Sequence, residues 1–306
     1  MGNEFLAFTL PPLVIATFAA LACAGPGNLL LLRRQSMLGD AMAHVVLPGI
    51  VAAFLLTGSA SHGVMLTGAL AAAAFSAVLI EVIRRATGAD PGAAMGVTFT
   101  AMFAAGVMLL ETSGAAAVHL DVEHALYGNL DSLIWVEAAD WSSLTDPSAL
   151  ATLPPELALL AGIAATVLLL LGLLWRPLTI ATFDDGFATT VGIRTRTLSA
   201  ALTALTALAA VAAFSAVGSI LTIAMLICPP ATARLLADSL PRQMALSLML
   251  AALAAILGTL IAGHLPPALG LSFTVSAAGT IATLSGLLLL LAAILSPRRH
   301  PAQRTT

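Results

Sequence analysis

Charged side chains are too scarce in this chain to cover the surface of a water-soluble protein. Only 9% of its 306 residues are charged, while 59% are hydrophobic. An average soluble domain carries about 25% charged residues, so a soluble fold of this length would expose a very large apolar surface. The scarcity therefore excludes soluble enzymes and predicts a protein embedded in a lipid bilayer. The net charge of −3 also offers no basic face for nucleic acid.

The apolar residues form long runs that do not alternate with polar ones. Runs such as residues 157–174 lack the alternation of a membrane β-strand, and a helix that crosses a bilayer needs about 20 mostly apolar residues. The sequence therefore predicts an all-α, polytopic transmembrane bundle that occupies residues 1–306 as a single domain. We expect about nine spans, within a range of about eight to ten, at residues 8–32, 41–57, 63–83, 93–111, 157–175, 198–216, 218–236, 244–263 and 274–295.

Spans 198–216 and 218–236 follow one another with almost no residues between them. The pair Gly218-Ser219 forms their junction. Such a junction predicts either a tight hairpin or a partly re-entrant turn, because irregular backbone at membrane depth is tolerated only where protein buries it.

The basic residues indicate how the chain is oriented, and all twelve of them are arginines. If nine helices alternate in direction, every arginine cluster falls on the same side of the membrane. Cytoplasmic loops are enriched in basic residues, so we expect the amino terminus outside and the carboxyl terminus in the cytoplasm. The clusters are Arg33 with Arg34, Arg84 with Arg85, Arg176 with Arg194 and Arg196, Arg234 with Arg242, and Arg298 with Arg299.

The segment 112–156 is then a long external loop that is rich in acidic residues. Its Trp135 and Trp141 are suited to the membrane interface, where indole rings concentrate. One short stretch of the loop carries potential cation ligands. A solvated acidic loop is the favoured interpretation, and a weak cation site at the entrance is the alternative. The residues concerned are His119, Asp121, Glu123 and His124.

One acidic residue and one histidine stand four positions apart at the start of an apolar span. Asp40 and His44 would share one face of a helix. A carboxylate and an imidazole supply half of a four-ligand site for a divalent transition metal, so two copies would complete it. The alternative is a hydrogen bond that anchors the helix end, but an ionisable pair inside a membrane favours a functional role. Pro48-Gly49 predicts a kink just beyond the pair.

The chain has no nucleotide-binding loop of its own. The Gly-x4-Gly-Lys-Ser/Thr loop requires a lysine, and the sequence contains none. If ATP drives this protein, a separate chain must therefore hold and hydrolyse it. The predicted cytoplasmic segment 176–197 mixes Asp, Gly, Phe and Arg residues, as a short amphipathic docking helix would.

Five stretches of the chain match known patterns in the same order. The first contains Asp40 and His44, and the fourth has the pattern Phe-Asp-x3-Ala-x3-Gly. Together they resemble the permease subunits of the manganese/zinc/iron class of metal ABC importers. The stretches are residues 33–49, 90–99, 124–130, 183–192 and 218–233, and the fourth pattern is formed by Phe183, Asp184, Ala188 and Gly192.

This resemblance implies a multi-pass protein of the bacterial plasma membrane that is surrounded by lipid. It implies pairing with a second permease copy or a paralogue, two ATPase subunits docked on residues 176–197, and delivery of the ion by an extracytoplasmic metal-binding protein. Asp40 and His44 would line the path of the ion, which is manganese or zinc, with iron as a further candidate. The metal ion is the cargo, and no cofactor is implied for the chain itself.

Two other classes of protein remain as alternatives. A stand-alone, proton-coupled secondary transporter would use Asp40 and His44 as a proton relay. A membrane anchor or sensor subunit would transport nothing.

Overall fold

The computed structural model describes residues 5–59, 61–112, 130–138, 140–268, 270 and 275–296. Within these ranges every regular element is a helix, which confirms the predicted all-α class. The short elements are η1 (Phe5–Thr9), η3 (Leu130–Ser132), η4 (Trp141–Leu144), α8 (Pro147–Leu150) and α11 (Asp185–Thr190). The longer ones are α2 (Leu10–Leu32), α3 (Met37–His44), α4 (Val46–Thr57), α5 (His62–Thr87), α6 (Pro91–Thr112), α9 (Pro155–Leu173), α10 (Trp175–Phe183), α12 (Thr195–Leu236), α13 (Leu240–Ala268) and α14 (Ala277–Leu295).

Seven helices within the described ranges are long and apolar enough to cross a membrane. Helix α12, with 42 residues, alone covers two of the predicted spans. The predicted span 41–57 is instead divided between α3 and the 12-residue helix α4. Since α4 is apolar but short, it does not cross a full bilayer by itself.

Helix α12 is kinked at Gly218, where the backbone is not helical. Its φ of 80° and ψ of 173° lie in a region that is essentially restricted to glycine. Val217, Gly218 and Ser219 are all buried, so the kink lies inside the bundle. The two predicted spans are therefore joined by a sharp kink at a single residue, with no separate loop between them.

Substitution of Gly218 by alanine is expected to destabilise the bundle by about 1–3 kcal/mol, because a residue with a side chain is strained at this backbone conformation. The matched control is Gly172→Ala in α9. No atom lies within 4 Å of the Cβ that this change adds, and a helical backbone favours alanine over glycine by about 0.5–1 kcal/mol. The thermal unfolding midpoint in detergent should fall for the first variant only, and equal midpoints would contradict the strain argument.

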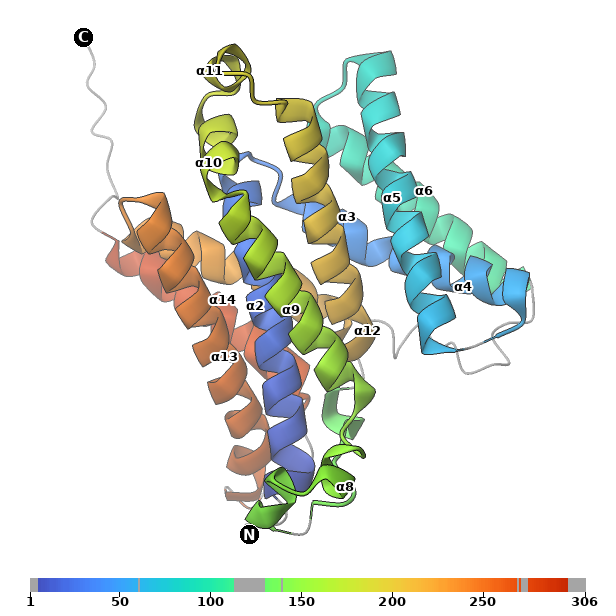
Figure 1. Cartoon of the computed structure of the whole chain (residues 1–306), viewed down its shortest axis with the longest axis vertical. Coiled ribbons are helices and arrows are strands. Elements are labelled where there is room, and N and C mark those ends of the chain that lie inside the picture. Colours follow the sequence, from blue (N-terminus) through green and yellow to red (C-terminus); the bar gives the residue numbers. More distant parts are fainter. Residues whose placement is uncertain are drawn as a thin grey trace.

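Helix α2 forms the centre of the larger of two groups of helices. Figure 1 shows it between α9, α12 and α13. Small residues let helices approach closely in a membrane, and Gly27 lies directly against the carbonyl of Leu226 in α12. A Cβ at position 27 would lie 3.0 Å from Cγ of Pro230. Pro230 has no amide hydrogen to donate to the Leu226 carbonyl four residues earlier. That carbonyl therefore lacks its helical hydrogen bond and points toward Gly27.

The smaller group consists of α4, α5 and α6, which lie together on one side of Figure 1. Gly49 of α4 packs on Gly68 of α5, and a Cβ at Gly106 of α6 would lie 2.8 Å from Cδ of Pro48. Helix α12 contacts this group through α5, and it contacts the larger group through α2, α13 and α14. Helix α3 joins the two groups, since it packs on both α6 and α12.

A separate small core forms near the amino terminus. Trp135 is fully buried there with Leu6 and Ala149, and its Nε1 donates a hydrogen bond to the Ala149 carbonyl at 2.8 Å. The indole N–H of Trp135 thus finds its partner within the loop, and the ring packs against protein side chains. Trp141 is 60% exposed and stacks on Phe5.

Candidate functional site

Asp40 and His44 both lie on α3, one helical turn apart, as their spacing predicts. The helix is interrupted at Val45, directly after His44, which agrees with the kink that Pro48-Gly49 predicts just beyond the pair. The physical reason is that the nitrogen of Pro48 cannot donate to the His44 carbonyl four residues earlier, and the proline ring disfavours helical backbone at that point. The Asp40 side chain lies outside the part of the chain that the structure describes.

Helix α3 is held closely by its neighbours. Leu38 and Met42 are buried. A Cβ on Gly39 would lie 3.2 Å from Cγ of Leu226 in α12, so a larger residue beside Asp40 would push the two helices apart. The backbone position of the Asp40–His44 turn is therefore determined by packing against the second half of α12.

The His44 ring lies between two aromatic rings of α6. Its centroid is 5.5 Å from that of Phe99, in a stacked arrangement, and 5.7 Å from that of Phe103, in an edge-on arrangement. These contacts orient the partly buried imidazole. The sequence analysis did not identify either phenylalanine, because no local pattern links residues more than fifty positions apart.

One copy of the chain does not provide a complete metal site within its described residues. No group of three or more His, Cys, Asp or Glu side chains that could hold a metal ion occurs there. Zinc, for example, is typically held by four ligands, so Asp40 and His44 can form only part of such a site. The predicted entrance residues lie outside the described part of the chain; they are His119, Asp121, Glu123 and His124.

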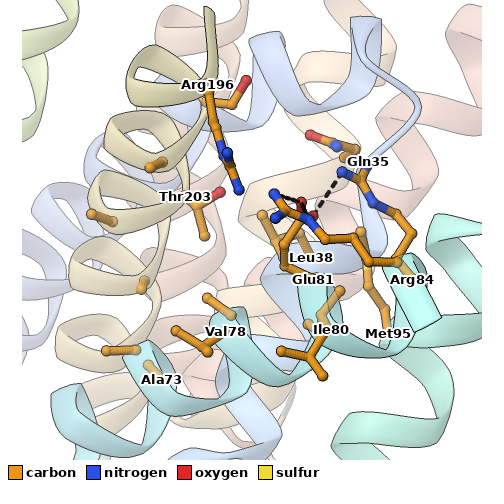
Figure 2. Close-up of a pocket in the computed structure, with 18 of the residues that line it drawn as sticks. Gln35, Leu38, Ala73, Val78, Ile80, Glu81, Arg84, Met95, Arg196 and Thr203 are labelled. Carbon is orange, nitrogen blue, oxygen red and sulfur yellow. Dashed lines mark hydrogen bonds and ion pairs between the residues drawn. The ribbon is translucent and has the colours of Figure 1, made fainter.

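A cavity of about 990 Å³ opens between α5, α12 and the beginning of α3 (Figure 2). Gln35 and Leu38 contribute to it from the α3 side. Glu81 of α5 forms ion pairs with Arg84 at 2.7 Å and with Arg85 at 2.6 Å. Figure 2 shows Arg196 of α12 pointing toward the same carboxylate. Arginines that the sequence places on one side of the membrane thus meet at one end of the bundle.

The predicted docking residues have different structural roles. Asp184 caps α11, since its Oδ1 accepts a hydrogen bond from the backbone N–H of Phe187 at 2.8 Å. Ala188 is fully buried and anchors α11 to the bundle. Gly192 ends the segment with a φ of 81°, which favours glycine. Phe183 is the large apolar side chain of the four, and it is 62% exposed.

Two residues that the sequence analysis did not include extend the exposed apolar surface of this segment. Phe187 and Val191 are 54% and 52% exposed, and they follow Phe183 at intervals of four residues. That spacing is the signal that could have identified them. Figure 1 shows α11 at the end of the bundle opposite the amino terminus. Exposed apolar side chains clustered outside the apolar spans are typical of an interaction surface.

A buried polar pair joins α2 to α13 beside the Gly27 contact. The Nε2 of Gln243 donates to Oδ1 of Asn28 at 3.1 Å, and Nδ2 of Asn28 donates to the Ala24 carbonyl at 2.7 Å. Both side chains are fully buried. Hydrogen bonds between helices stabilise membrane bundles, so we interpret this pair as structural.

Comparison with known proteins agrees with the architecture. The chain matches the ABC 3 transport family over residues 6–142 and 148–296. It is 35% identical to the manganese transport system membrane protein MntD of Bacillus subtilis (strain 168), over 93% of this chain and 91% of that protein. It is 34% identical to the zinc transport system membrane protein TroD of Treponema pallidum (strain Nichols), over 97% of this chain and 76% of that protein.

A solved structure has the same fold. PsaBC from Streptococcus pneumoniae in complex with Fab contains a chain that matches with a TM-score of 0.74 and 27% identity, covering 95% of this chain and 92% of that one. All five motif stretches noted in the sequence lie within the residues that the family matches. Seven apolar helices lie within the described ranges. The chain is a multi-pass protein of the bacterial plasma membrane, and it belongs to the ABC 3 transport family.

Proposed function

We propose that this chain is the permease subunit of an ATP-driven importer of a divalent transition-metal ion, with manganese and zinc as the principal candidates. The observation that carries the proposal is its similarity, over more than nine-tenths of its length, to a manganese and a zinc transport membrane protein. The chain itself performs no covalent chemistry in this proposal, and the ion is its cargo.

Asp40 and His44 hold the ion during its passage in this proposal. A second copy of the chain, or a paralogue, contributes the equivalent pair, so that two carboxylates and two imidazoles converge on a shared pore. The position of both residues on one turn of α3 supports this assignment. The aromatic contacts of His44 with α6 support it further, because an oriented imidazole is a better ligand than a mobile one.

ATP hydrolysis belongs to two separate ATPase subunits that dock on α10 and α11. The exposed side chains of Phe183, Phe187 and Val191 support this location, since aromatic residues are frequent anchors of protein interfaces. The conformation of the segment is stabilised by Asp184, Ala188 and Gly192. The absence of any lysine for a nucleotide-binding loop supports the assignment of ATP to another chain.

The orientation that we propose places α11 in the cytoplasm and the amino terminus outside. Nine membrane-inserted segments result if α4 is added to the seven long helices and α12 is divided at Gly218. The clustering of Arg84, Arg85 and Arg196 around one cavity supports a cytoplasmic location for that end. An extracytoplasmic binding protein would deliver the ion at the opposite end. The acidic segment there would attract cations, and its candidate residues are His119, Asp121, Glu123 and His124.

Cellular metal content tests this proposal. A bacterial strain that lacks manganese and zinc uptake is complemented with the chain and its native ATPase and binding-protein partners, and each element is measured by mass spectrometry. We expect manganese or zinc to accumulate only when the ATPase is catalytically intact. Accumulation without the ATPase would indicate the proton-coupled transporter instead, which the family membership does not favour. No accumulation of any metal would contradict both.

A further inference from the structure

Arg33 occupies the junction between α2 and the helix that carries Asp40 and His44. Its backbone N–H donates to the Leu29 carbonyl at 3.0 Å and ends α2. Arg34 follows with a φ of 57°, a left-handed conformation that is uncommon for a residue with a side chain. Helix α3 begins at Met37, so very few residues separate Arg33 from α3. The tight connection means that a displacement of Arg33 is transmitted to α3.

The Arg33 side chain contacts the docking segment, residues 176–197, and the helix that follows it. Its Nε donates to Oγ1 of Thr182 in α10 at 3.0 Å, one residue before Phe183. Its Nη1 donates to Oγ of Ser199 at 2.9 Å, near the beginning of α12. A guanidinium group can make these bonds simultaneously because its donors are arranged in a rigid fork. One side chain thus connects α10 and the beginning of α12, on either side of α11, to the end of α2.

Arg33 differs from the surface arginines in its burial and in its surroundings. The side chain is partly buried, whereas those of Arg34, Arg84 and Arg85 are exposed. Burial lowers the pKa of Arg33 from its ordinary value, and the negative charge of Asp185 in α11 acts in the opposite direction. Its third nitrogen, Nη2, is buried and has no hydrogen-bond partner within the described part of the chain. Arg33 therefore has an unused donor close to the charged end of α11.

We propose that Arg33 is a positioning residue that couples the docking segment to α3, so that movement of α11 by the ATPases displaces the Asp40–His44 turn. The inference rests on the proposed function, because it assumes that the docking segment and the metal-binding turn act as assigned above. The contacts predict a specific defect: without Arg33 the ATPases still bind and hydrolyse ATP, but hydrolysis no longer drives the ion through the bundle.

The experiment measures manganese uptake and ATP hydrolysis by the complete complex, purified with its ATPase and reconstituted in liposomes with the binding protein. For Arg33→Ala we expect unchanged co-purification of the ATPase and a decrease of about tenfold in manganese transported per ATP hydrolysed, within the range typical of coupling between two sites. Arg33→Lys should be intermediate, because lysine retains the charge but not the fork. Arg242→Ala is the matched control, since it removes an exposed arginine outside the docking segment.

A second set of variants removes the two acceptors and leaves Arg33 in place. Thr182→Val combined with Ser199→Ala should lower the transport ratio in the same way, and adding Arg33→Ala should cause little further loss because the same interactions are removed. If the Arg33→Ala complex does not assemble, this double variant still tests whether the Arg33 contacts couple hydrolysis to transport. A merely structural role would reduce the amount of complex but not the ratio of transport to hydrolysis.

Three outcomes would overturn the proposal. The first is an unchanged ratio in Arg33→Ala or in the double variant, and the second is loss of ATPase co-purification, which would make Arg33 part of the docking surface. The third is a ratio that falls equally in Arg242→Ala. A wild-type complex that transports no manganese, zinc or iron would instead contradict the proposed function itself, so the two failures are distinguishable.

Discussion

Alanine at Asp40 or at His44 is expected to reduce metal accumulation to the level of cells that lack the protein. Each change removes one ligand from both copies of α3, so a four-ligand site would retain only half of its ligands. Removal of a residue that merely supports a ligand typically costs about 10–100-fold in metal affinity or activity, and we expect the loss of a direct ligand to exceed this. The measurement is the cellular content of each metal in the complemented strain described above.

The matched control is His264→Ala, which removes an exposed histidine from α13. Accumulation should remain at the wild-type level in this variant. Co-purification of the ATPase with Asp40→Ala and His44→Ala should also be unchanged, because both residues lie on α3 and outside the docking segment. Full restoration of every metal by both variants would show that the assignment of these residues is wrong.

Loss of the aromatic docking surface is the second large effect that we expect. In Phe183→Ala combined with Phe187→Ala, two exposed rings are removed, one from the end of α10 and one from α11. An aromatic anchor near the centre of an interface typically contributes about 2 kcal/mol or more, which corresponds to about 30-fold in Kd for each ring. The amount of ATPase that co-purifies should therefore fall strongly, and ATP-driven uptake should fall with it.

Trp141→Ala is the control for this pair, because it removes an indole ring that is exposed to a similar extent, at 60%, outside the docking segment. Its effect on co-purification should be negligible. If the double phenylalanine variant retained the ATPase at the wild-type level, the partner would have to contact another part of the bundle. The thermal unfolding midpoint of the isolated permease distinguishes a docking defect from a folding defect.

The sequence predicts those features of the candidate site that depend on the spacing of residues within a few positions of each other. Asp40 and His44 fall on one helical turn because residues four apart always share a helix face. The break at Val45, just beyond the pair, was likewise predictable from Pro48, because proline leaves the carbonyl four residues before it without its helical donor. The docking motif was found as a pattern, yet only the fold shows the role of each residue: Asp184 caps α11, Ala188 is buried, and Phe183 presents an exposed ring.

The sequence does not reveal contacts whose partner is distant in the chain. Trp135 is suited to an interface by its residue type, and only the fold shows that Leu6 and Ala149 bury it. Phe99 and Phe103 look like ordinary apolar residues of a span until the fold brings His44 between them. No periodicity encodes such contacts, because they depend on how helices pack and not on how each helix forms.

The sequence by itself determined that this is an all-helical membrane protein, since 9% charged residues cannot cover a soluble surface. It also determined that Asp40 and His44 share a helix and that the chain has no nucleotide-binding loop. The tertiary structure decided which helices hold that turn in place and that Arg33 connects it to the docking segment. The physical reason is that helix formation depends on neighbours within a turn or two, whereas the Arg33 hydrogen bonds join residues 149 and 166 positions apart.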